Sequence, residues 1–225
     1  MSRVSVALRP FSLRLTGRTA RAVAVVTAVA LPFAGCTAAQ KASTSSSYVI
    51  IQSLQGASGA TPDKLSGVLA SDVVTNVKVT QGSNTVLVPT VYEDPGQVIF
   101  KLGLKDPGTA DSPTQPSTNN FITINRYHVN YVRADGRATP GVDVPYPFDG
   151  AFTATVTNDG ATANLTLVRI QAKEEAPLKQ LAGAGGALAI STIAQVTFYG
   201  ADQSGREVSA QGQISVTFAD WGDPQ

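Results

Sequence analysis

Residues 142–157, VDVPYPFDGAFTATVT, alternate in character over sixteen positions. The even-numbered positions are apolar or glycine, and the odd-numbered positions are polar, proline or alanine. Because successive side chains of a β-strand point to opposite faces, this period of two indicates a strand with one buried face. Pro145 and Pro147 lack N–H donors on the same side, which predicts that the first half lies at a sheet edge. We expect the strand to bend at Gly150.

The rest of the chain after residue 47 follows the same β pattern. Valine and threonine are abundant, the intervening segments are rich in turn formers, and no long stretch has a helical period. Apolar residues change parity within residues 121–133, which predicts a β-bulge near Asn125 and Arg126, or a strand that passes between sheets. Pro89 indicates an edge strand or a bulge, and residues 158–160, NDG, predict a hairpin turn. The predicted strands cover residues 48–55, 72–80, 85–92, 97–104, 121–133, 142–157, 162–170, 190–200 and 207–218.

The last two predicted strands flank ADQSGR, residues 201–206. This pair resembles the closing hairpin of immunoglobulin-like and fibronectin-like domains in bacterial surface proteins. The resemblance covers about thirty residues, and the cysteine pair of antibody domains is missing. We therefore expect residues 48–225 to form an all-β, immunoglobulin-like or fibronectin-like β-sandwich of about seven to nine strands, as one sandwich or as two smaller subdomains.

The N-terminal segment has the features of an export signal. Residues 1–21 hold five arginines and no acidic residue, and residues 22–34 are apolar apart from Thr27. A membrane-spanning helix needs about 20 apolar residues, which is more than this run provides. A basic region, a short apolar region and small residues at the end are typical of a secretory signal peptide over residues 1–35.

Residues 33–36, FAGC, contain the only cysteine of the chain. They resemble the lipobox of bacterial lipoproteins, in which the cysteine thiol receives a diacylglycerol and the chain is cut just before it. The resemblance implies that Cys36 is lipidated and that its acyl chains hold the protein on the lipid bilayer of the cell envelope, at the periplasmic face or the cell surface. Residues 36–47 are small and polar and would form a flexible tether. Two alternatives stay open: an uncleaved anchor helix, and a signal cut after Ala39.

Composition limits the partners of the exported chain. Without residues 1–35, 12 basic residues remain beside 16 acidic ones, a net charge of −4. This charge argues against a nucleic-acid partner, which favours a basic surface. No cysteine is left for a disulfide, so the packed core must hold the fold by itself.

Sequence motifs for catalysis or metal binding are missing. His128 is the sole histidine, which excludes a metal site with several histidines. No GxSxG motif occurs, so nothing in the sequence indicates a serine triad. The aspartates at turns are better explained as turn formers than as calcium ligands, and residues 182–189 lack the spacing of a nucleotide-binding loop. The sequence therefore predicts no metal, no cofactor and no enzyme. The turn aspartates are Asp135, Asp143, Asp149 and Asp159.

Aromatic residues offer the remaining functional hint. Tyr127, Tyr131, Tyr146 and Phe148 share strand faces with valines, which favours the core, although they could instead form a binding platform. Trp221 follows the last predicted strand and is the aromatic residue least easily placed in the core. Trp221, Tyr146 and Tyr127 are thus the candidate ligand contacts.

These observations favour a non-catalytic, membrane-anchored envelope lipoprotein whose domain serves structure or interaction with an envelope protein. The alternative is a module that binds a polysaccharide or a peptide, with Trp221 or the proline-rich segment 106–120 at its site. A hydrolase that uses a carboxylate pair is the weaker alternative.

Overall fold

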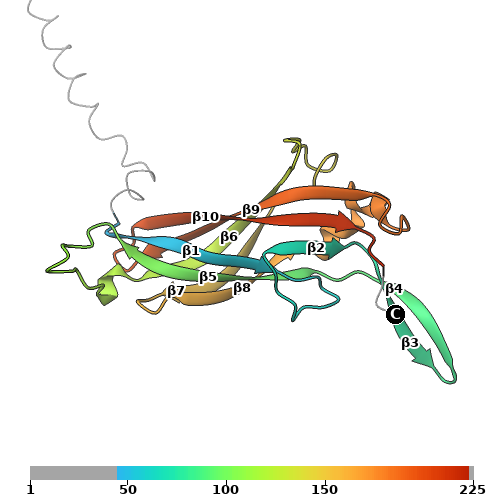
Figure 1. Ribbon diagram of the computed structural model, residues 1–225, viewed down its shortest axis with the longest axis horizontal. Helices are drawn as coiled ribbons and strands as arrows, with labels where there is room; N and C mark the ends of the chain where they lie inside the picture. The colour runs from blue at the N-terminus through green and yellow to red at the C-terminus, as the bar shows by residue number, and fades with distance from the viewer. Residues whose placement is uncertain (1–44, 223–225) are drawn as a thin grey trace, which may run out of the picture. The chain divides into compact units, whose positions relative to one another are not determined.

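The computed structural model describes residues 45–222, and Figure 1 shows their arrangement. The predicted signal peptide, Cys36 and most of the expected tether lie outside the described residues. Within them, ten strands form two sheets and a separate hairpin. No helix in this part of the chain is long and apolar enough to cross a membrane.

The smaller sheet has three strands in the order β1-β5-β8 and the larger has five in the order β2-β10-β9-β6-β7. All pairings are antiparallel except that of β2 with β10, which is parallel. The all-β sandwich prediction is confirmed, and the eight strands of the two sheets fall within the predicted number. The sheet strands are β1 (Ser47–Gly56), β2 (Val68–Asp72), β5 (Asp94–Leu104), β6 (Ile122–Arg133), β7 (Phe148–Val156), β8 (Ala161–Val168), β9 (Ala189–Asp202) and β10 (Glu207–Ala219).

The remaining elements are a hairpin and three short helices. Among the described strands, β3 (Thr75–Gln81) and β4 (Asn84–Thr90) pair only with each other, and they stand apart from the sheets (Figure 1). Thr75 is the one buried residue of this hairpin. The helices are η1 (Thr118–Asn120), α3 (Ile170–Glu174) and η2 (Leu178–Leu181). The proline-containing β4 therefore has a free edge, as expected from Pro89.

An aromatic cluster fills the space between the two sheets. The centre of the Phe198 ring lies 5.0 Å from the centre of the Phe100 ring, in an edge-to-face contact, and 6.1 Å from the centre of the Phe152 ring. The buried Tyr131 hydroxyl donates a hydrogen bond to the carbonyl of Leu167, and the Tyr127 hydroxyl accepts one from the N–H of Thr166. Since the tyrosines belong to β6 and their partners to β8, both bonds join the two sheets.

The parity change in β6 produces the predicted bulge. The pairing registers of β6 with β7 and with β9 both shift between Ile124 and Arg126. Consequently Ile124 before the bulge and Tyr127 after it both face the core, although their separation is odd. Gly200 lies opposite the bulge, where a Cβ atom would come 2.2 Å from the carbonyl oxygen of Thr123. The backbones approach so closely there that only glycine fits.

Two sequence predictions for this region are wrong. The strand expected over residues 142–157 begins only at Phe148, because residues 142–147 belong to a loop. The predicted NDG hairpin is absent, because β7 and β8 belong to different sheets. Residues 158–160 form a tight turn closed by a bridge between Thr157 and Gly160, and the chain then enters the other sheet. β7 does lie at an edge of the five-stranded sheet, but Pro145 and Pro147, on which the edge prediction rested, lie in the loop before it.

Candidate functional site

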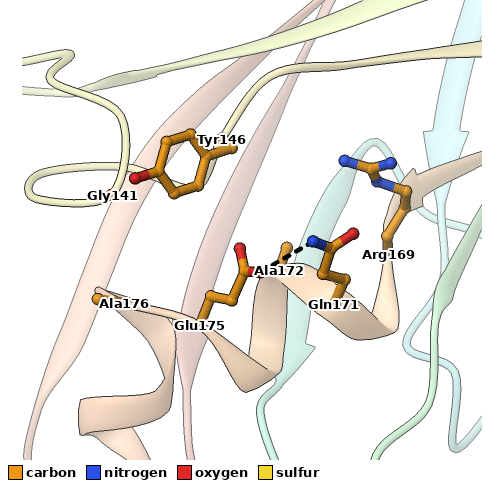
Figure 2. Close-up of a pocket in the computed structure, with 7 residues that line it drawn as sticks. All are labelled: Gly141, Tyr146, Arg169, Gln171, Ala172, Glu175 and Ala176. Carbon is orange, nitrogen blue, oxygen red and sulfur yellow. Dashed lines mark hydrogen bonds between the residues drawn. The ribbon is translucent and has the colours of Figure 1, made fainter.

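An open pocket of about 550 Å³ lies between the loop of residues 134–147 and the segment around α3. The loop contributes Gly141 and Tyr146 to the wall. The second segment contributes five residues: Arg169, Gln171, Ala172, Glu175 and Ala176. We refer to these seven residues as the α3 pocket. Figure 2 shows Tyr146 on one side and the Arg169 guanidinium on the other, with Gln171 and Glu175 between them along α3.

Short-range hydrogen bonds hold the loop that carries Tyr146. The carbonyl oxygen of Thr139 accepts bonds from the N–H groups of residues 142, 143 and 144, and Gly141 N–H donates to the carbonyl of Val144 over 2.8 Å. Val144 is buried, whereas the Tyr146 side chain is 52% exposed. Gly141 has a φ of +75°, and a Cβ atom there would lie 2.4 Å from the Tyr146 hydroxyl oxygen. Glycine thus permits both the turn and the close contact of the tyrosine ring.

Ion pairs at the surface brace the same loop. Arg137 contacts the carboxylate of Asp135 at 2.7 Å and that of Asp143 at 3.5 Å. Asp135 also accepts a hydrogen bond from the backbone N–H of Arg137, as a turn-forming aspartate does. The turn-former interpretation is therefore confirmed for Asp135.

We expect the pKa of the Asp135 carboxyl to lie well below that of an ordinary aspartate. The side-chain hydrogen bonds of Arg137, followed by its backbone N–H, lower the pKa of Asp135 from 3.8 to about 2. A lowered pKa means that Asp135 stabilises the fold above pH 4 and loses this effect as the pH falls toward 2. Carbon-detected NMR titration should give a midpoint near the lower value in the wild type. In Arg137→Gln the midpoint should rise toward the ordinary value, while Arg126→Gln, which does not touch Asp135, should leave it unchanged.

A buried ion pair fixes α3 against the sandwich. The Lys173 ammonium lies 2.8 Å from the Asp94 carboxylate, and both side chains are almost completely buried. The same carboxylate accepts hydrogen bonds from the Gly59 N–H and the Ser71 hydroxyl. Burial raises the pKa of Asp94, and the charge and hydrogen bond of Lys173 oppose this rise together with the other donors. Four segments of the chain therefore meet at one carboxylate, and α3 is held against the sandwich.

Arg169 precedes α3 and is the cation of the pocket. Its guanidinium carbon lies 4.3 Å from the centre of the Phe148 ring, a cation–π distance. Its Nε atom is buried and has no hydrogen-bond partner within the described part of the chain. No carboxylate among residues 45–222 forms an ion pair with it. Arg169 is therefore oriented by an aromatic ring, and no anionic side chain of the described residues pairs with it.

Glu175 supplies the acceptor side of the pocket. One of its carboxylate oxygens accepts a hydrogen bond from the Gln171 amide over 2.8 Å, drawn as a dashed line in Figure 2. The two residues are separated by four positions and so lie on one side of the α3 segment. The pocket thus presents one positive and one negative group with a polar amide between them.

The structure brings only one of the predicted ligand contacts into the pocket. Tyr146 lines it, against the expectation that this ring belongs to the core. Tyr127 is buried between the sheets, as the core interpretation expected, so it cannot contact a ligand from solvent. Trp221 is 37% exposed and lies elsewhere, its backbone N–H bonded to the Asp72 carboxylate. The predicted lipidation site, Cys36, lies outside the described residues.

The other candidate groups do not assemble into a site. His128 is partly exposed and contacts the Asp149 carboxylate at 3.2 Å, beside Arg126. No group of three histidine, cysteine, aspartate or glutamate residues in the described chain could hold a metal ion. The 106–120 segment contributes no residue to the α3 pocket. Sequence reasoning missed Arg169, Gln171 and Glu175, because a charged stretch after a strand gives no local sign of a pocket.

The described residues form an all-β sandwich domain with an open pocket of about 550 Å³ that is lined by both polar and apolar groups. Comparisons with family models, curated proteins and solved structures find no match to it. The functional argument therefore rests on the side chains of the α3 pocket and on the N-terminal sequence.

Proposed function

We propose that this chain is an envelope lipoprotein that is anchored through acylated Cys36 and binds a ligand in the α3 pocket without catalysing a reaction. The N-terminal sequence supports the anchor, since a basic region and an apolar run precede FAGC. The pocket supports the binding function and is the observation that carries it. The ligand is a small polar molecule or the end of a peptide, including one that belongs to an envelope protein.

The dimensions and chemistry of the pocket suit binding. Its volume of about 550 Å³ lies within the range of small-molecule sites, roughly 300–1,000 Å³. An exposed tyrosine ring and a few convergent polar groups are the usual means of orienting a ligand. The lining residues include a single carboxylate, Glu175, so the pocket gives no support to a carboxylate-pair hydrolase.

The anchor is tested by the intact mass of the protein purified from bacterial membranes. The wild-type mass should equal residues 36–225 plus an acylated glycerol, and Cys36→Ala should lack the added lipid. An uncut, unlipidated chain would establish an anchor helix instead. A chain cut after Ala39 without lipid would establish a secreted domain.

The binding function is tested by thermal unfolding of the full chain with amino acids, short peptides and sugars. A ligand that binds the folded state raises the melting temperature by mass action. Gln171→Trp places a large ring in the α3 pocket and should abolish the rise. Gln180→Trp, an exposed position on η2 outside the pocket, is the matched control and should retain it. A rise that persists in Gln171→Trp, or no rise with any compound, would contradict this function.

A further inference from the structure

The guanidinium of Arg169, which has no ion-pair partner among residues 45–222, indicates which chemical group the pocket receives. A guanidinium carries five N–H donors, and a buried donor without an acceptor costs free energy. The Nε of Arg169 is such a donor within the described residues. Because this Nε has almost no surface open to solvent, a ligand oxygen would instead accept hydrogen bonds from the terminal N–H groups of the guanidinium, which lines the pocket.

Contacts around Arg169 prepare it for that role. The Phe148 ring lies against the guanidinium at 4.3 Å and limits its motion. Because Phe148 is itself buried, the position of the ring is set by the sandwich core. A planar guanidinium fixed in this way can donate two parallel hydrogen bonds to a carboxylate, and little conformational entropy is lost on binding.

Glu175 determines which second group a ligand needs besides the anionic group that binds Arg169. Its carboxylate already accepts the Gln171 amide, and a carboxylate has capacity for further donors. The Arg169 and Glu175 charges cancel, and none of the other described residues that line the pocket is charged. A neutral pocket with a cation and an anion fits a ligand that carries one negative charge and a nearby N–H donor. A phosphate dianion would face Glu175 without a second cation, so the pocket disfavours it.

We infer that the α3 pocket binds the carboxyl-terminal end of a peptide, with the terminal carboxylate on Arg169, a backbone N–H on Glu175 and a side chain against Tyr146. This inference rests on the proposed binding function. It specifies the ligand class and assigns Arg169 and Glu175 as the residues that select it.

The test compares three probes that differ in one group. Trialanine carries a free carboxylate, trialanine amide lacks it, and inorganic phosphate supplies a multiply charged anion without an N–H donor. Each is added to the full chain, and binding is measured by saturation-transfer NMR and calorimetry. Trialanine should bind, its amide should bind at least tenfold more weakly, and phosphate should not displace trialanine.

Variants separate the guanidinium from the rest of the pocket. Arg169→Met should abolish trialanine binding, and Arg169→Lys should weaken it severalfold because an ammonium cannot donate the same paired hydrogen bonds. Glu175→Gln should weaken it less. Arg126→Met removes an exposed arginine outside the pocket and should leave binding unchanged. Circular dichroism verifies that each variant is folded, and Arg169→Lys preserves the test if Arg169→Met is not.

The remaining outcomes distinguish this inference from the proposed function. Equal binding of trialanine and its amide, or equal competition by phosphate, would overturn the carboxylate assignment and leave a ligand pocket. If a sugar binds and trialanine does not, and Gln171→Trp abolishes the binding of the sugar, the carboxylate assignment is likewise wrong and the pocket is still a binding site. If no compound binds in the pocket, both the inference and the binding function are wrong.

Discussion

Replacing Lys173 by methionine should lower the free energy of unfolding by about 3–5 kcal/mol at pH 7. The ammonium of Lys173 is the only cation within ion-pair distance of the buried Asp94 carboxylate in the described chain. Without it, an uncompensated negative charge remains in the core, where burial already raises the pKa of Asp94. Guanidinium unfolding of the variant and the wild type measures the difference.

Two further variants test the origin of this loss. Lys173→Met combined with Asp94→Asn should recover more than half of it, because a neutral amide still accepts the Gly59 N–H. Lys179→Met, at an exposed position of η2, should change stability by less than about 0.5 kcal/mol. The deficit of Lys173→Met should also shrink between pH 7 and pH 5, since protonation neutralises the unpaired carboxylate. A deficit that is independent of pH and unaffected by Asp94→Asn would assign the loss to packing alone.

Replacing Phe198 by alanine should lower the free energy of unfolding by a similar amount, about 3–5 kcal/mol. Phe198 is fully buried, and its ring contacts those of Phe100, Tyr127 and Phe152. The cavity would open between the two sheets, where backbone strands on both sides limit relaxation. Thermal or denaturant unfolding measures the loss.

The neighbouring position provides the control for this variant. Tyr199 lies on the opposite face of β9, where its ring is stacked with the Arg126 guanidinium and is partly exposed. Tyr199→Ala should cost about 1 kcal/mol. Phe198→Leu, which keeps most of the volume, should also cost far less than Phe198→Ala. Equal losses at positions 198 and 199 would show that the aromatic cluster is not the centre of the core.

Local patterns in the sequence predicted local structure well. The parity change in residues 121–133 located the bulge between Ile124 and Arg126, because each strand residue reports which face it occupies. The short segment 201–206 between the last two predicted strands likewise indicated the hairpin of β9 and β10. The strand prediction from alternation was wrong at residues 142–147. The apolar alternation continues there, but three backbone N–H groups donate hydrogen bonds to the Thr139 carbonyl, and the backbone turns instead of extending. Val142 is consequently exposed, although Val144 is buried.

Features that depend on distant residues could not be read from the chain. Lys173 and Asp94 are 79 positions apart, and nothing near either residue indicates that they meet. The pocket also depends on residues that are distant in the sequence, because Tyr146 and Glu175 belong to separate segments that lie together only in the folded chain. Of the candidate ligand contacts, Tyr146 was identified by residue type alone, and its place beside Arg169 required the fold.

The β3–β4 hairpin has a consequence for copies of this protein that are crowded together. Among the described strands, this two-stranded sheet has unpaired edges, to which another chain can add a strand through backbone hydrogen bonds. The exposed side chains of Val86, Leu87 and Val88 would strengthen such a contact. Pro89 removes one backbone donor from β4, and Lys78 places a charge opposite Leu87. Both features disfavour the addition of a strand from a neighbouring molecule, Pro89 through its missing N–H and Lys78 through its charge.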